Sequence, residues 1–273
     1  MKFAHIRDRI ANNPGFRTLE EVRRAGYRIV KERDGERYFL AKPEELEPLL
    51  VRLGDIAEVR FGIKTGANEF FYLEPVGMTV KEVAKLAQKD PMAPVRVKNS
   101  AGWEGEIEAE FLRPVITSLK YVRTLRVDLR DLKRLLFVCH ASKASLREKK
   151  KFLALRYIKW GESQGYNKRR TCASRLRWWD VGEHPLSHII YSRRLGDRHL
   201  CPINSAALVS DTLYKIMTEY KEIVALTISS TLGRLLLESE GRELTGAITV
   251  VELYIPDLLR VFILTMSHFP GDL

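Results

Sequence analysis

The sequence has no run of about 18 apolar residues, the length that a membrane-spanning helix needs. Its first residues, MKFAHIRDRIANN, lack the apolar core of a signal peptide. Cysteine is scarce: Cys139, Cys172 and Cys201 lie far apart, without the CxxC or Cys/His spacing of a zinc site. These absences predict a cytoplasmic chain with no membrane partner and with reduced, structural thiols.

Common catalytic motifs are missing as well, because the sequence has no GxSxG, no HExxH and no acidic cluster of metal-binding type. One nuclease-like pattern remains: Asp131, Glu148 and Lys150 could hold Mg²⁺ and activate water. Glu148 is expected in the first turn of a basic helix over 145–162, however, where a carboxylate equally suits the helix dipole. An Mg²⁺-dependent nuclease is therefore the alternative to a chain without a complete catalytic site.

Acidic residues are scarce in the middle of the chain but not on either side. Residues 1–112 hold 19 Lys/Arg and 19 Asp/Glu, and residues 180–273 hold 8 and 12. Residues 113–179 hold 19 Lys/Arg against 4 Asp/Glu, a net charge of +15. Such a block repels itself unless a polyanion lies against it, so it predicts a surface that contacts nucleic-acid phosphates.

The apolar periodicity and the turn signals predict an α+β fold with short mixed β-strands and peripheral helices. Hairpins are expected over 27–40 and 95–111, a strand, glycine-rich loop and strand over 53–73, and a long helix over 219–238. The expected organisation is a helical and hairpin entry segment at 1–50, a main domain at 51–260 and a C-terminal tail at 261–273.

Two segments carry residue types that contact nucleic acids. In the loop at 62–68, Lys64 offers a charge to phosphate, while Thr65 and Asn68 offer hydrogen bonds from a solvent-facing tip. Residues 160–179 interleave aromatics, which can stack on bases, with cations that neutralise phosphates. The predicted DNA-binding residues are Lys64, Thr65, Asn68, Lys143, Tyr166, Lys168, Arg169, Arg170, Arg175, Trp178, Arg193 and Arg194. Core packing is the alternative for the tryptophans, and an RNA-binding module is the alternative for the whole segment.

The stretch LGDIAEVRFGIKTGANEFFYL (53–73) resembles the target-recognition domain of adenine-N6 DNA methyltransferases of restriction–modification systems, including type IIG enzymes and phage-defence methylases. The resemblance continues through ALRYIKWG (154–161), Gly165-Tyr166 and Arg177-Trp178-Trp179. It ends in the late helix and the glycines at 229–246, so it covers about residues 50–260.

Members of that family that methylate DNA have an upstream S-adenosylmethionine domain with a glycine-rich loop and an NPPY/F tetrapeptide. This sequence contains neither that cofactor-binding glycine-rich loop nor the tetrapeptide. The resemblance therefore implies a target-recognition module that binds duplex DNA sequence-specifically, with no catalytic residue and no cofactor in this chain. It also implies a partner, a methyltransferase catalytic domain or subunit, which would supply catalysis and bind the S-adenosylmethionine.

Overall fold

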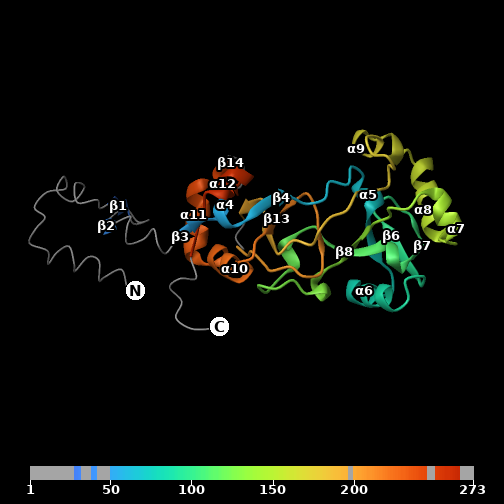
Figure 1. Cartoon of the computed structure of the whole chain (residues 1–273), viewed down its shortest axis with the longest axis horizontal. Helices are drawn as coiled ribbons and strands as arrows, with labels where there is room; N and C mark the ends of the chain where they lie inside the picture. Colours follow the sequence, from blue (N-terminus) through green and yellow to red (C-terminus); the bar gives the residue numbers. More distant parts are fainter. Residues whose placement is uncertain (1–27, 32–37, 42–49, 196–198, 245–249, 265–273) are drawn as a thin grey trace, which may run out of the picture.

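The computed structural model describes residues 28–31, 38–41, 50–195, 199–244 and 250–264. In these residues short strands in several sheets are combined with nine α-helices, so the predicted α+β fold is confirmed. Figure 1 shows two lobes that follow one another along the long axis. Among the described residues, none of the helices has the length and apolarity to cross a bilayer.

The larger lobe is built on a six-stranded sheet with the strand order β12-β8-β9-β5-β6-β7. Its neighbours pair antiparallel, except that β12 runs parallel to β8. The strands are β5 (Tyr72–Pro75), β6 (Pro94–Asn99), β7 (Glu104–Glu108), β8 (Leu112–Ile116), β9 (Arg134–Phe137) and β12 (Leu208–Val209). The helices that border this sheet in Figure 1 are α5 (Asn68–Phe71), α6 (Val80–Lys89), α7 (Lys143–Glu148), α8 (Phe152–Ser163) and α9 (Arg170–Ala173).

An aromatic cluster in the larger lobe fixes α5 against α8. The Phe70 ring stacks on Tyr157, with ring centroids 4.5 Å apart, and tilts against Trp178 at 4.7 Å. The Tyr157 hydroxyl donates to the Phe70 carbonyl oxygen at 2.5 Å. Gly161 makes room for these rings, because a Cβ there would lie 2.6 Å from both Phe70 and Trp178. Close packing of this kind holds the ends of α5 and α8 in fixed positions.

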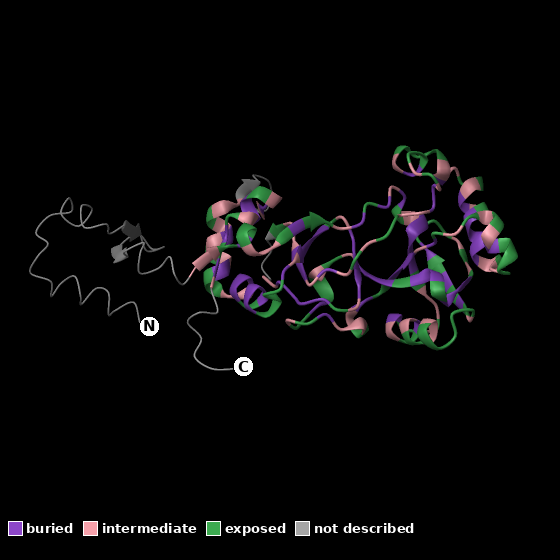
Figure 2. Ribbon diagram, in the orientation of Figure 1, coloured by how far each residue is buried: buried purple, intermediate pink, exposed green. Residues whose placement is uncertain are grey.

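The smaller lobe has its own hydrophobic core, which forms a second group of buried ribbon in Figure 2. Its main sheet is antiparallel, with the order β10-β13-β4, and β3 pairs separately with β16. These strands are β3 (Leu50–Arg52), β4 (Glu58–Phe61), β10 (Ile189–Ser192), β13 (Leu213–Met217) and β16 (Phe262–Leu264). A further sheet contains β11 (Arg194–Leu195), β14 (Arg242–Leu244) and β15 (Val250–Glu252). The helices are α4 (Leu53–Ile56), α10 (Lys221–Ser229), α11 (Thr231–Glu240) and α12 (Ile255–Leu259).

Two predicted hairpins are confirmed, and two predicted helices are each divided. β1 (Arg28–Lys31) pairs with β2 (Tyr38–Ala41), and β6 pairs with β7. The helix predicted over 145–162 is interrupted at Lys150, which has a φ of 58°. The helix predicted over 219–238 is interrupted at Ser230, whose hydroxyl accepts the N–H of Gly233 and begins α11. The helical part of the predicted entry segment lies outside the described residues.

Candidate nucleic-acid interface

The loop at 62–68 leaves β4 and lies directly against other segments of the chain. A Cβ at Gly62 would lie 2.0 Å from the carbonyl oxygen of Ser210. Gly66 has a φ of +79°, and a Cβ there would lie 2.6 Å from the Thr171 side chain. Both glycines are therefore required by close contacts inside the protein.

The side chains of this loop have different environments. Thr65 is fully buried (0% exposed), and its hydroxyl contacts the Asn68 side chain and accepts the N–H of Ala67 at 3.3 Å. The prediction that Thr65 faces solvent is wrong, because its hydroxyl stabilises the loop from within. Lys64 and Asn68 are exposed, as predicted. The loop also enters the short helix α5 at Asn68, rather than continuing directly into a strand.

The segment from η5 (Tyr166–Lys168) into α9 carries the exposed cations. Lys168 and Arg170 are exposed, and neither forms an ion pair with any residue that the structure describes. Arg169 donates two hydrogen bonds to Glu69, at 2.9 and 3.2 Å, and its guanidinium lies over the Tyr166 ring. The Arg169 hydrogen bond holds the pKa of Glu69 below its ordinary value.

These cations and the loop belong to one surface because side chains from around α9 tie the two segments together. Arg175 Nη2 donates to the Lys64 carbonyl oxygen at 2.7 Å, and the Cys172 thiol points to the Thr65 carbonyl oxygen at 3.7 Å. Figure 1 places α9 beside α5, at one side of the larger lobe. We call the exposed set the α9 surface: Lys64, Asn68, Lys168, Arg169 and Arg170.

Four other predicted DNA-binding residues, Lys143, Tyr166, Arg175 and Trp178, form contacts inside the protein next to this surface. Trp178 and Tyr166 are buried, and the indole N–H of Trp178 donates to Glu162 at 3.0 Å. The Lys143 ammonium binds both carboxylate oxygens of the same Glu162, at 2.5 and 2.6 Å. Arg175 also donates to the Trp178 carbonyl oxygen at 3.3 Å. The predicted base contacts of Trp178 and Tyr166 need correction, because both rings lie inside the core. Lys143 and Arg175 are half-buried, and their DNA contacts stay a prediction.

Arg193 and Arg194 lie in a different place from the α9 surface. The Arg193 Nε lies 2.9 Å from the buried carboxylate of Glu252, and its guanidinium lies over the Tyr254 ring. Arg194 is more exposed and lies 3.7 Å from the same carboxylate. These two arginines neutralise a buried charge of the smaller lobe, so the structure does not bring them together with the other predicted residues.

The nuclease pattern is not assembled into one site. Asp131 belongs to η4 (Leu129–Asp131) and lines a cavity that neither Glu148 nor Lys150 lines. Glu148 is the last residue of α7, rather than part of a first turn as predicted, and it is exposed. Within the described part of the chain, no group of three or more His, Cys, Asp or Glu side chains could hold a metal ion.

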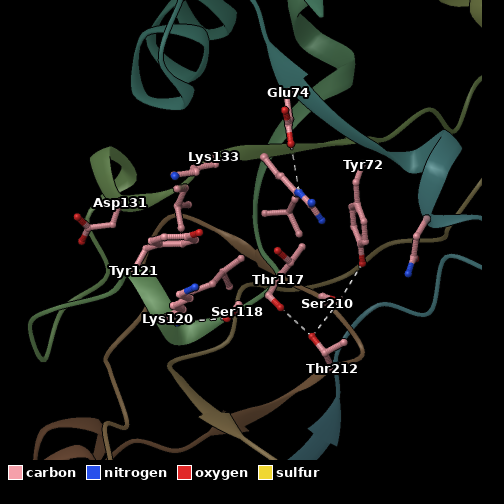
Figure 3. A pocket seen from close by; sticks show the side chains of 15 residues that line it. Tyr72, Glu74, Thr117, Ser118, Lys120, Tyr121, Asp131, Lys133, Ser210 and Thr212 are labelled. Atoms are coloured by element: carbon pink, nitrogen blue, oxygen red, sulfur yellow. Dashed lines mark hydrogen bonds and ion pairs between the residues drawn. The ribbon is translucent and has the colours of Figure 1, made fainter. Parts of the chain in front are cut away.

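A cavity of about 670 Å³ adjoins the α9 surface, because Asn68 is one of the residues that line it. Figure 3 shows Tyr72, Tyr121 and Lys133 around it. Sequence reasoning missed Tyr121 and Lys133 as site residues. The charge of residues 113–179 marks the whole segment as basic, but it does not show which of its cations share a cavity.

Residues 36–254 match the family model described as the C-terminal domain of the type II methyltransferase M.Eco57I. The match includes the α9 surface, the cavity and most of both lobes. The chain belongs to this family. Its membership confirms the resemblance found in the sequence and gives the chain a role related to restriction–modification.

Among solved structures, that of the type IIG restriction endonuclease BpuSI is similar, with a TM-score of 0.49 and 14% sequence identity. The similarity covers 82% of this chain and 25% of the BpuSI chain, so this chain spans a quarter of the length of that protein. No curated protein matches the chain.

Proposed function

We propose that this chain is the target-recognition module of a restriction–modification methyltransferase and binds duplex DNA in a sequence-specific manner. The observation that carries the proposal is the α9 surface on a member of this methyltransferase family. Lys168 and Arg170 offer their full charge to phosphate oxygens, since no carboxylate of the described residues pairs with them.

The wider electrostatics of the larger lobe support the same proposal. Of the 19 Lys/Arg in residues 113–179, six form ion pairs with carboxylates of described residues. The six are Arg130, Arg134, Lys143, Lys151, Arg169 and Arg177. The remaining excess of positive charge attracts a polyanion over a distance of about 10 Å at moderate salt.

The side chains of the α9 surface fall into two groups: those that would bind phosphates and position the duplex, and one that would contact the edges of bases. Phosphate oxygens of any DNA sequence can bind the ammonium groups of Lys64 and Lys168 and the planar guanidinium of Arg170. These three side chains would therefore position the duplex without sequence preference. Asn68 is exposed at the start of α5, and its amide oxygen accepts from the buried Thr65 hydroxyl, so its amide N–H groups are the part that can donate to acceptors on base edges. Because the buried aromatic cluster fixes α5, the position of Asn68 at the start of this helix is fixed as well.

Catalysis belongs to a different part of the enzyme in this proposal. The matching family model is that of a C-terminal domain of a methyltransferase, which supports a separate catalytic domain or subunit as the partner. S-adenosylmethionine would bind to that partner, and the role of this chain would be to place the target base within its reach.

The direct test is an anisotropy titration of the purified chain with a fluorescent random-sequence duplex DNA and with double-stranded RNA of equal length. We expect the DNA to bind with an affinity that falls steeply as salt is raised, because phosphate contacts release counterions. We expect the RNA to bind more weakly, since the A-form major groove is too narrow for side chains to enter.

Preference for the RNA would contradict the proposal and would favour an RNA-binding module. Failure to bind either nucleic acid at low salt would contradict both.

A further inference from the structure

The cavity beside the α9 surface lies between η3 (Leu119–Tyr121), the strands β5 and β9, and the turn at 210–212. Its volume of about 670 Å³ is far larger than a single phosphate contact needs, and it falls within the range of small-ligand sites. Figure 3 shows that polar side chains line it on both sides. A cavity of this size can hold a ligand as large as a nucleotide.

One end of the cavity is cationic and aromatic. The Lys133 ammonium lies 4.3 Å from the centroid of the Tyr121 ring, and that ring is 44% exposed. No carboxylate of the described residues lies within ion-pair distance of Lys133. A neutral ring restricts the ammonium without neutralising it, so Lys133 is both positioned and still fully charged. This combination suits a phosphate group.

The other end of the cavity consists of hydroxyl groups. Tyr72 donates to Ser210 Oγ at 2.9 Å, and the Thr212 hydroxyl lies 3.3 Å from the same oxygen and donates to the Thr117 carbonyl at 2.9 Å. Burial raises the pKa of Tyr72 to about 12, so this phenol stays neutral. The hydroxyl oxygens at this end can accept further hydrogen bonds from the polar edge of a ligand, whereas the neutral Tyr72 phenol is not a base.

Two carboxylates also line the cavity, and they distinguish between possible occupants. Glu74 of β5 lines it and lies 3.7 Å from Arg134, and Asp131 of η4 lines its edge with its carboxylate pointing outward in Figure 3. A site for bare phosphate gains nothing from carboxylates at its rim, which repel the anion. A nucleotide carries a phosphate that can bind the cations, together with base N–H groups that can donate hydrogen bonds to carboxylates.

From these contacts we propose that the cavity binds one nucleotide, with its phosphate on Lys133 and its base between Tyr121 and the hydroxyl end. Because Asn68 lines the cavity and also belongs to the α9 surface, a DNA strand that lies on that surface comes beside the cavity. A nucleotide of the bound strand is therefore the natural source, and in this respect the inference rests on the proposed function. A free mononucleotide offers the same chemistry.

The test titrates 2′-deoxyadenosine 5′-monophosphate into the full chain and follows the ligand by NMR. We expect Lys133→Gln to weaken binding about tenfold, because a charge-assisted hydrogen bond to phosphate is lost. Tyr121→Leu, which removes the ring that positions Lys133, should weaken binding, while Tyr121→Phe should leave it unchanged. Lys85→Gln on the exposed face of α6 is the matched control and should bind as the wild type does.

A second arm identifies the source of the nucleotide. Duplex DNA that carries 2-aminopurine in place of adenine should gain fluorescence on binding to the wild type and to Lys85→Gln, and gain less on binding to Lys133→Gln. A gain confined to the wild type and control assigns the site to the bound strand. Unchanged fluorescence, together with mononucleotide binding that needs Lys133, assigns it to a free nucleotide.

No mononucleotide binding, or equal binding by Lys133→Gln and Lys85→Gln, would overturn the inference. A chain that binds the mononucleotide but no duplex would contradict the proposed function while leaving the cavity assignment intact. A chain that binds duplex DNA but no mononucleotide would contradict the cavity assignment while leaving the proposed function intact.

Discussion

Arg169 and its two neighbours show that the surroundings of a cationic side chain determine whether its charge is available to bind phosphate. Arg169 shares its charge with Glu69, whereas Lys168 and Arg170 have no carboxylate partner among the described residues. Both members of the pair are more than 40% exposed, at 43% and 42%. An exposed pair of this kind contributes less than about 1 kcal/mol to stability, so Arg169 can exchange Glu69 for a phosphate at little cost.

Replacing Arg169 should change the titration of Glu69. Arg169→Gln is expected to raise the pKa of Glu69 toward its ordinary value of 4.5, because the hydrogen bond from Arg169 is the largest cause of the lowering. Carboxyl-carbon NMR measures this pKa directly. Arg170→Gln is the control, since Arg170 makes no hydrogen bond to Glu69. An equal rise in both variants would contradict the account.

The same ion pair makes the stability of the protein depend on pH, and its contribution decreases in acid. Folding lowers the pKa of Glu69, so the stabilisation is present above the unfolded pKa and is lost as pH falls through the folded pKa. The wild type and Arg169→Gln should therefore become equally stable in acid.

Thr65 and Lys64 are adjacent, yet only the substitution of Thr65 should change the stability of the protein. Thr65→Val removes the hydroxyl that accepts the Ala67 N–H in the buried loop, and we expect it to lower the free energy of unfolding by about 1–3 kcal/mol. Lys64→Ala should stay within about 0.5 kcal/mol of the wild type, because its side chain is exposed. Urea unfolding measures both. Equal stability of the two variants would show that the loop does not depend on Thr65.

At the scale of elements, local signals in the sequence predict the structure well where no distant contact intervenes. The two hairpins follow from turn residues flanked by alternating strands. The unpredicted helix α6 also has a local signal, because Thr79 and Glu82 form a capping box at its start. By contrast, α8 begins where Glu108 accepts the N–H groups of Leu153 and Ala154, at 2.9 and 2.8 Å. That carboxylate lies about 45 residues away, so the sequence pattern alone could not divide the predicted helix.

The packing of α8 against α5 gives a prediction at this scale. Gly161→Ala should lower the free energy of unfolding by about 1–3 kcal/mol, because the added methyl overlaps Phe70 and Trp178. The helix propensity of alanine, which favours the substitution by up to about 1 kcal/mol, opposes this cost. Lys159→Ala, on the exposed side of the same helix, is the control and should be neutral. A Gly161→Ala protein as stable as the control would mean that the aromatic cluster can rearrange freely.

At the scale of the whole molecule, the sequence predicts the fold class, the family and the position of the basic block along the chain. It does not predict how that charge is distributed over the surface. Arg169 meets Glu69 across 100 residues, and Lys143 meets Glu162 across 19, so folding neutralises some cations and leaves others available. Likewise, Trp178 and Tyr166 carry side chains suited to base stacking, but the fold uses both as core. Charge and residue type thus indicate a candidate interface, while burial determines which of its side chains are exposed.

The central claim is that Lys168 and Arg170 contact DNA phosphates, and the salt dependence of duplex binding tests it most directly. Each phosphate contact contributes about −0.9 to the slope of log affinity against log salt. The double variant Lys168→Gln/Arg170→Gln should therefore have a slope that is flatter by about 2 units. The control is Lys85→Gln/Lys89→Gln, which removes the same charge from α6, on the opposite side of the larger lobe from α9 in Figure 1. The account predicts that the control keeps the wild-type slope, and equal slopes for the two double variants would contradict it.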